Sequence, residues 1–230
     1  AIIERFRTPN LFIMYGQTEA GPVASLRPPD VRRKPTSVGR PALHVDVRIV
    51  DAGGREVTPG AVGEIVCRSE YTMLGYWRMP EATAGTLRDG WLHTGDLAAF
   101  DDEGFLHIAG RAREMIKCGG ENIFPVEVER CLLEHPGIAE AAVFGVPDTH
   151  WGEVTVAAVV SRPGETLDAA GVVEHVRARL ASYKKPRHVY FVDALPRTAS
   201  TRQVQKALLR ELWLQARSQA DGPSPTRGPG

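Results

Sequence analysis

Short stretches of alternating apolar and polar residues occupy the first half of the chain, a pattern typical of half-buried β-strands. The pattern predicts strands over residues 44–49, 63–69 and 104–109. The apolar run LFIMYG at residues 11–16 predicts a buried strand that leads into a turn. Prolines and basic residues dominate residues 21–42, so we expect an irregular loop there. Short strands separated by glycine turns indicate a small barrel-like or sandwich-like unit.

Helical periodicity begins in the second half of the chain at Pro125, a residue that suits the first position of a helix. One face of this predicted helix carries Val128, Cys131, Leu132 and His135. The Pro-Gly pair that follows is expected to end the helix.

Three further strands are predicted over residues 138–146, 153–161 and 188–192, and Asp168 can cap a second helix. The apolar stripes predicted for the last two helices are Val173, Val176 and Leu180, and then Val204, Leu208 and Leu212. The order of helices and strands predicts a compact α+β domain over residues 114–213.

Composition excludes several classes of protein. The 230 residues include 28 basic and 28 acidic side chains, so the formal net charge is zero, whereas a general nucleic-acid binder needs a basic excess. No apolar run approaches the ~20 residues that cross a bilayer, and the first residues lack the layout of a signal peptide. The three cysteines lack metal-like spacing and form no even disulfide set, so we expect a reducing, cytoplasmic location.

Two stretches carry candidate chemistry. Residues 89–129 combine a Trp that looks buried (Trp91), an acid that looks exposed in a turn (Asp96), a cluster of basic residues and a Gly-Gly turn. Such a mixture is costly in a simple core and indicates a polar ligand on one side and a second domain on the other. A polar triplet at residues 17–19 follows a buried strand, where ligand contacts are common, although an ordinary surface turn has the same pattern.

Five motifs then occur together in one order. They are YGQTE (15–19), GEIVCRSEYTMLGYW (63–77), DGWLHTGDLAAFDDEGFLHIAGRAREMIK (89–117), GGENIFPVEVE (119–129) and LPRTAS (195–200). In this order they resemble the C-terminal part of the adenylate-forming (AMP-binding) superfamily, in its acyl-CoA synthetase branch. The resemblance implies a two-step ligase reaction. A carboxylic acid attacks the α-phosphate of ATP to give acyl-AMP, and the thiol of CoA then displaces AMP.

The first motif, in this resemblance, belongs to the nucleotide site. Tyr15 would lie along the adenine, with Gly16 and Gln17 in the same nucleotide-binding segment. Thr18 would offer its hydroxyl to a phosphate, and Glu19 would hold Mg²⁺, which prefers carboxylate and phosphate oxygens.

The later motifs would complete the site. Asp96 would accept both ribose hydroxyls, as a carboxylate can, and Arg111 would donate to the ribose. Arg113 would be the hinge about which a small domain swings. Lys117 and Gly119-Gly120 would lie where the pantetheine arm of CoA enters. Glycines would be needed in this turn because a side chain there would block the thiol.

Simpler interpretations remain open for each residue. Asp96 can order a turn, Arg111 can be a surface residue, and Trp91 fits a core better than a site. Lys117 can be a solvated strand residue, and Gly119-Gly120 a plain hairpin turn.

Two departures from the family pattern concern activity. The glycine-rich phosphate loop and most of the acyl pocket precede the family segments found here, so we expect residues 1–230 alone to be inactive. The late motif also differs, since Gln203 stands where the family has a catalytic Lys and Arg202 where it has Gly. Gln cannot supply positive charge to a phosphate, so Arg202 or Lys206 would have to replace it.

The sequence therefore predicts a mixed α/β and α+β protein. Residues 1–111 would be the end of the large AMP-binding domain with a small β-barrel-like subdomain, and residues 112–113 the hinge. Residues 114–213 would form the small mobile C-terminal domain, and residues 214–230 a disordered tail. The predicted function is that of an acyl-CoA synthetase acting on a carboxylic acid, for example in fatty acid metabolism, with ATP, Mg²⁺ and CoA. The alternative is a non-catalytic nucleotide-binding or CoA-binding remnant that serves as an interaction module.

Overall fold

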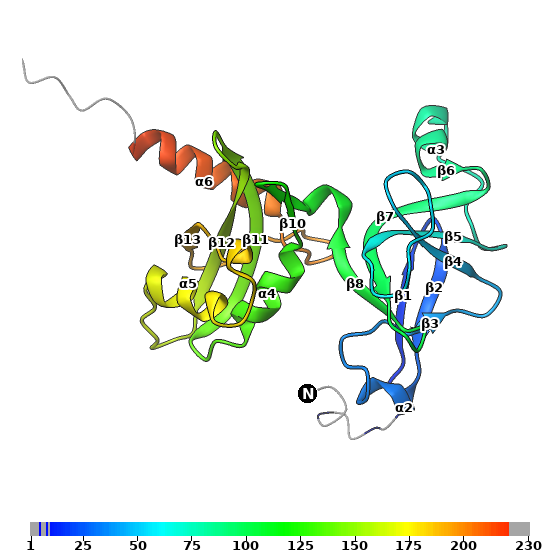
Figure 1. Cartoon of the computed structure of the whole chain (residues 1–230), viewed down its shortest axis with the longest axis horizontal. Helices are drawn as coiled ribbons and strands as arrows, with labels where there is room; N and C mark the ends of the chain where they lie inside the picture. The colour runs from blue at the N-terminus through cyan, green and yellow to red at the C-terminus, as the bar shows by residue number, and fades with distance from the viewer. Residues whose placement is uncertain (1–4, 6–7, 9, 221–230) are drawn as a thin grey trace, which may run out of the picture. The chain divides into compact units, whose positions relative to one another are not determined.

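The chain folds into two compact units, residues 1–113 and residues 114–230 (Figure 1). The computed structural model describes residues 5, 8 and 10–220. Each unit contains its own buried cluster of apolar side chains, so each is described by itself. Within the described residues, no helix is long and apolar enough to cross a membrane.

The first unit is built from two antiparallel sheets. One has the strand order β1-β2-β3, and the other has the order β4-β5-β7-β6 with β8 paired to β7. The strands are β1 (Ile13–Gln17), β2 (Gly21–Leu26), β3 (Arg40–Pro41), β4 (Asp46–Val50), β5 (Gly63–Arg68), β6 (Leu87–Arg88), β7 (Trp91–Phe100) and β8 (Leu106–Arg111). Two short helices, α2 (Pro28–Val31) and α3 (Pro80–Thr86), complete the unit. Side chains from both sheets, among them Val23, Ile65 and Leu92, share one core.

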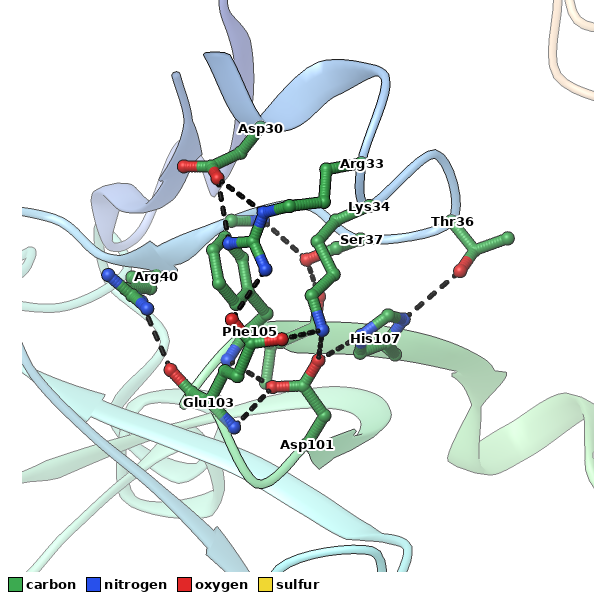
Figure 2. Close-up of polar contacts among 12 residues, drawn as sticks. Asp30, Arg33, Lys34, Thr36, Ser37, Arg40, Asp101, Glu103, Phe105 and His107 are labelled. Atoms are coloured by element: carbon green, nitrogen blue, oxygen red, sulfur yellow. Dashed lines mark hydrogen bonds and ion pairs between the residues drawn. The ribbon is translucent and has the colours of Figure 1, made fainter. Parts of the chain in front are cut away.

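A network of charged residues covers Phe105 at one end of this unit (Figure 2). Lys34 Nζ lies 2.7 Å from Asp101 Oδ2 and 2.7 Å from Glu103 Oε1, while Arg33 pairs with Glu103 as well. Burial alone would raise the pKa of Asp101, but hydrogen bonds, chiefly from Lys34, outweigh it and hold that pKa below its usual range. The network anchors the segment between β2 and β3 to the turn between β7 and β8.

The second unit is a five-stranded sheet with helices on both faces. Its order is β10-β9-β12-β11, and β13 pairs with β12 in parallel. The strands are β9 (Ile116–Cys118), β10 (Glu121–Ile123), β11 (Ile138–Asp148), β12 (Gly152–Ser161) and β13 (His188–Phe191), and the helices are α4 (Pro125–Leu133), α5 (Ala169–Arg177) and α6 (Lys206–Ala220). The 3₁₀ turn η2 (Ser182–Lys184) adds to these, and a second 3₁₀ turn, η1 (Ala112–Glu114), runs across the division between the two units at residue 113.

Alternation along β12 explains the two covered faces. Ala157 and Val159 point into the core shared with α4 and α5, whereas Val156 and Ala158 point into the core shared with α6. A strand that is buried on both faces reads as a nearly continuous apolar run, as this one does.

The predictions for the first unit are partly confirmed. The strand at residues 63–69 is β5, the one at residues 44–49 is β4 with a later start, and residues 104–109 overlap β8. The expected irregular loop at residues 21–42 is wrong, because it contains β2, α2 and β3. Strand pairing overrode the prolines there, since Pro22 lies beside a bulge in its own strand β2 and Pro41 occupies the edge strand β3.

The faces predicted for the first two helices of the second unit are confirmed in part, since Val128, Cys131 and Leu132 are buried in α4. α4 begins at Pro125, although His135 lies beyond its end at Leu133. The Asp168 cap is confirmed, because its Oδ1 accepts the N–H of Gly171 at 2.8 Å. Of the stripe predicted for α5, Val176 is buried, but the other buried position is Val172 instead of Val173, and Leu180 lies beyond the end of the helix.

The predicted buried face of the last helix is wrong by one residue. The predicted end of the helix is also wrong, because α6 continues to Ala220. Leu209 and Trp213 are 1% and 8% exposed, whereas Leu208 and Leu212 are 37% and 41% exposed. Val204 cannot set the helical phase because it precedes α6 and pairs with Arg197 in a β-bridge. Residues 214–220 belong to α6 and are not a disordered tail. Residues 221–230 of that predicted tail lie outside the described residues.

This corrected face gives a matched pair of variants. Leu209→Ala removes a side chain from the core of the second unit and should lower the free energy of unfolding by about 2–5 kcal/mol. Leu208→Ala, on the half-exposed side of the same helical turn, should cost less than about 1 kcal/mol. Urea unfolding of both variants, followed by circular dichroism, checks this. Equal losses would mean that α6 faces the sheet differently.

Candidate nucleotide site

Asp96 lies at a bulge in β7. Glu64 of β5 faces Leu97 and Val66 faces His93, so the three residues 94–96 of β7 stand opposite Ile65 alone. Gly95 adopts φ +70°, a conformation that favours glycine over any residue with a side chain. The strand therefore changes direction at Gly95 and carries the next side chain inward, and Asp96 is only 8% exposed.

Two side chains hold the bulge in place. Thr94 Oγ1 donates to the carbonyl of Ile65 at 2.8 Å and accepts the N–H of Asp96 at 3.1 Å. Glu64 Oε1 accepts the N–H of Gly95 at 3.0 Å, and Glu64 Oε2 lies 2.9 Å from His93 Nδ1. The interpretation of Asp96 as an exposed acid in a turn is therefore wrong, because it is a buried strand residue.

The Asp96 carboxylate gathers donors from two strands, β1 and β8. Tyr15 and Gln17 point to the same face of β1, and both donate to Asp96 Oδ2, at 2.7 Å from the hydroxyl and 2.9 Å from the amide. Gln17 also donates to the carbonyl of Thr94 at 3.0 Å. Arg111 stands directly opposite Asp96 in the β7–β8 ladder, with its Nε 3.4 Å from Oδ1.

The two carboxylate oxygens differ in what they can still accept. Oδ2 already takes two short hydrogen bonds, whereas the only ion pair found at Oδ1 among the described residues is the long one from Arg111. Burial raises the pKa of Tyr15, and the hydrogen bond to Asp96 raises it further, so its hydroxyl stays a neutral donor. A carboxylate oxygen with spare acceptor capacity suits a ligand that presents hydroxyl groups.

The rest of the YGQTE motif forms the tight β1–β2 connection. A Cβ on Gly16 would lie 2.3 Å from the carbonyl oxygen of Gly21, so only glycine fits there. Thr18 is exposed in the turn. Glu19 Oε1 accepts the hydroxyl of Tyr76 at 3.0 Å, and burial together with this bond raises the pKa of Tyr76.

Glu19 stands apart from other candidate metal ligands. No group of three or more His, Cys, Asp or Glu side chains that could hold a metal occurs among the described residues. A lone carboxylate nevertheless fits Mg²⁺, which keeps several waters and usually takes one or two carboxylates together with the phosphates of a substrate.

The candidate residues of the second unit surround a hairpin. Lys117 is an exposed residue of β9, and Gly119-Gly120 form the turn to β10 with φ values of +59° and +87°. The N–H of Gly119 donates to the carbonyl of Trp151 at 2.9 Å. A Cβ on Gly119 would lie 2.6 Å from Cε3 of Trp151, so glycine lets the turn pack against this ring. The interpretation of these residues as a strand and a hairpin turn describes their conformation correctly.

The loop before α6 contains the residues aligned with the family's Gly and Lys. Arg202 has φ +58°, so a non-glycine residue occupies a conformation that glycine prefers, in the position aligned with that Gly. Gln203 is exposed, and its backbone N–H donates to Thr198 Oγ1 at 3.1 Å. Lys206 is 17% exposed, and its Nζ lies 2.9 Å from Glu114 and 2.8 Å from Glu129. Lys206 is therefore committed to two ion pairs within its own unit.

Three further predicted residues have clear surroundings. Arg113 is exposed within η1. Arg111 is not an isolated surface residue, because it faces Asp96. Trp91 is not a core residue, since it is half-buried and the guanidinium groups of Arg48 and Arg68 lie 4.4 Å and 4.7 Å from its ring.

Sequence reasoning missed the residues that shape the site. Glu64, Thr94 and Tyr76 lie inside motifs that were recognised, but nothing in their spacing shows which group each contacts. A bulge register is not visible in a single sequence, so the contact between Glu64 and Gly95 could not be derived from it.

Two models of one protein family match the chain. The AMP-binding enzyme model matches residues 1–77, and the AMP-binding enzyme C-terminal domain model matches residues 127–202. The chain belongs to the AMP-binding enzyme family. Among the curated relatives of this chain, indoleacetate–CoA ligase of Aromatoleum aromaticum is 48% identical over 200 residues, which are 86% of this chain and 39% of the relative. A long-chain-fatty-acid–CoA ligase of Escherichia coli O157:H7 is 40% identical over 207 residues, which are 90% of this chain and 36% of the relative.

Solved structures agree on the mixed α/β fold. The amide bond synthetase McbA from Marinactinospora thermotolerans matches with a TM-score of 0.83 and 42% identity, over 88% of this chain and 42% of that protein. ATP-bound MatB from Rhodopseudomonas palustris matches with a TM-score of 0.83 and 39% identity, over 88% of this chain and 40% of that protein. The chain spans about two fifths of the length of the curated relatives and structures that it matches.

Proposed function

We propose that this chain carries the ribose-binding part of an ATP-dependent acid–CoA ligase. The full-length enzyme would activate a carboxylic acid as acyl-AMP and then transfer the acyl group to CoA. The buried Asp96 carboxylate, with one oxygen saturated by protein donors and the other ready to accept, is the observation that carries the proposal. One relative is named for indoleacetate and another for long-chain fatty acids. We therefore propose carboxylic acids as the substrate class and name no single compound.

The ribose hydroxyls would bind at Asp96. Its Oδ1 is the free acceptor, and Tyr15 and Gln17 hold the carboxylate so that it does not rotate away. Arg111, at 3.4 Å, is close enough to shift toward a ribose oxygen while it still neutralises the carboxylate. The ring of Tyr15 would then lie along the adenine.

Phosphate binding would involve the neighbouring turn. Thr18 is exposed and can donate its hydroxyl to a phosphate oxygen. Glu19 would be a ligand of Mg²⁺, which neutralises phosphate charge when bound. Tyr76 donates to Glu19 and so keeps this carboxylate in a fixed orientation.

The second unit would serve CoA. Gly119-Gly120 leave a turn without side chains, which suits the passage of a narrow pantetheine arm beside Lys117. We further propose the domain limits 1–111 and 114–213, with a hinge at residues 112–113 in which Arg113 changes conformation between the two half-reactions.

A second candidate function is a non-catalytic nucleotide-binding or CoA-binding module. The observation that favours it is the neutral Gln203, together with the commitment of Lys206 to Glu114 and Glu129. Of the cations considered for the missing charge, exposed Arg202 is the better placed to move toward a phosphate. We prefer the first candidate because Tyr15, Gln17 and Arg111 all contact the Asp96 carboxylate.

The first test replaces the acceptor. Asp96→Asn keeps the shape of the side chain but presents an amide in place of one oxygen. Each lost bond to a charged acceptor should weaken ATP use by about tenfold or more in the full-length enzyme, because such bonds contribute roughly 1.5–3 kcal/mol. Pyrophosphate release measured against ATP concentration gives the value, with the exposed acid variant Asp46→Ala as control. An unchanged apparent affinity for ATP in Asp96→Asn would contradict the ribose assignment.

The second test adds the missing charge. Gln203→Lys should speed adenylation by about tenfold or more if this residue stands beside the α-phosphate, because a positioned cation stabilises the developing charge. Thioester formation should change little. Gln203→Met, neutral and of similar length, is the control. No effect of Gln203→Lys together with loss of adenylation in Arg202→Ala would show that Arg202 supplies the charge.

A further inference from the structure

Glu64 contacts both sides of the turn in β7 that precedes Asp96. One oxygen accepts the N–H of Gly95 at 3.0 Å, and the other lies 2.9 Å from Nδ1 of His93. Glu64 itself is a β5 residue paired with Leu97, the residue that follows Asp96. The carboxylate therefore joins His93, just before the bulge, to Gly95 within it.

Backbone pairing leaves this bulge with little support of its own. Residues 94–96 stand against Ile65 alone, so normal ladder bonds to β5 are interrupted there. Gly95, at φ +70° and without a side chain, is the most permissive point of the strand. The N–H of Gly95 finds its acceptor in the Glu64 side chain, so the conformation that turns Asp96 inward depends on Glu64.

Among the described residues, no hydrogen bond or ion pair joins Glu64 to the donors around Asp96. Tyr15 and Gln17 reach the carboxylate from β1, and Arg111 reaches it from β8, whereas Glu64 acts from β5 on the backbone. Its side chain is 27% exposed and that of His93 is 17% exposed, so the pair is shielded from water but is not part of the apolar core. The acceptor that Glu64 offers to the Gly95 N–H restricts the geometry of this glycine turn.

We propose that Glu64 is a positioning residue for Asp96, and that it sets how strictly the site requires ribose hydroxyl groups. The inference rests on the proposed function, since it assumes that Asp96 accepts those hydroxyls. Without the Glu64 clamp, Gly95 samples other conformations and the Asp96 carboxylate is no longer held at one position. Hydrogen-bond geometry at the ribose then degrades, although the carboxylate and its charge remain.

The experiment compares ATP with 2′-deoxy-ATP and 3′-deoxy-ATP in the adenylation reaction of the full-length enzyme. The readout is the ratio of kcat/KM for ATP to kcat/KM for each analogue. Partial unfolding lowers both values equally and leaves the ratio unchanged, so the ratio separates positioning from stability. The wild type should prefer ATP by about tenfold or more, as expected for one bond to a charged acceptor.

Four variants show whether a change in the kcat/KM ratio comes from the loss of the Glu64 acceptors. Glu64→Met keeps the length of the side chain but removes both acceptors, and it should lower the ratio most of the way to the value for Asp96→Asn. Glu64→Gln keeps an acceptor for Gly95 and a polar partner for His93, so it should retain the discrimination within about twofold. Asp46→Ala, which removes an exposed acid paired with Arg68 on the same sheet, should not change the ratio. The double variant Glu64→Met/Asp96→Asn should lose no more discrimination than Asp96→Asn alone.

The outcomes separate the inference from the proposed function. If Asp96→Asn keeps full discrimination, the ribose assignment fails and the inference fails with it. If Asp96→Asn loses discrimination but Glu64→Met keeps it, only the positioning role of Glu64 is overturned. Should Glu64→Met not fold, His93→Leu removes one partner of the clamp and must still lower the ratio. A ratio equal to that of the wild type in His93→Leu would then overturn the inference.

Discussion

A buried carboxylate determines how the first unit is organised. Moving a charged group out of water costs several kcal/mol unless polar partners replace the lost hydration. Asp96 receives those partners from β1 and β8, strands that belong to different sheets. The contact therefore connects the two sheets of the unit as well as forming the candidate site. A carboxylate held by three donors keeps one orientation, which a binding site for a diol requires.

The geometry around Asp96 is achieved in two stages. The bulge of β7, with Gly95 in a left-handed conformation, brings the side chain to the interior. Thr94 and Glu64 then fix the backbone of that bulge, and Tyr15 and Gln17 fix the carboxylate itself. The network at the far end of β7 differs, because there Arg33 and Lys34 neutralise Asp101 and Glu103 around the buried ring of Phe105. There the charges hold a loop, whereas at Asp96 one oxygen is left to accept a ligand.

Local patterns in the sequence predicted part of this arrangement. The β5 strand, the start of α4 and the Asp168 cap follow from alternation, from proline geometry and from a side chain that competes for a backbone N–H. The site residues Tyr15 and Asp96 were found through their motifs, but their direct contact was not predicted. That contact depends on the register of β5 against β7 and on the packing of β1 across the unit, both of which are tertiary.

The errors have related causes. Leu208 and Leu212 fit a helical repeat counted from Val204, but that residue lies in a β-bridge, and the core selected Leu209 and Trp213. Prolines in residues 21–42 indicated a loop, yet antiparallel pairing formed β2 and β3 around them. In each case tertiary contacts overrode a local preference.

A structure of the protein with AMP bound would show whether Asp96 accepts the ribose hydroxyls. We expect a ribose hydroxyl within hydrogen-bond distance of Asp96 Oδ1, while Tyr15 and Gln17 still donate to Oδ2. The Gly95 N–H should remain on Glu64. AMP bound with its ribose hydroxyls in solvent, or at a place that Asp96 does not reach, would contradict the claim that the β7 bulge exists to present this carboxylate to a nucleotide.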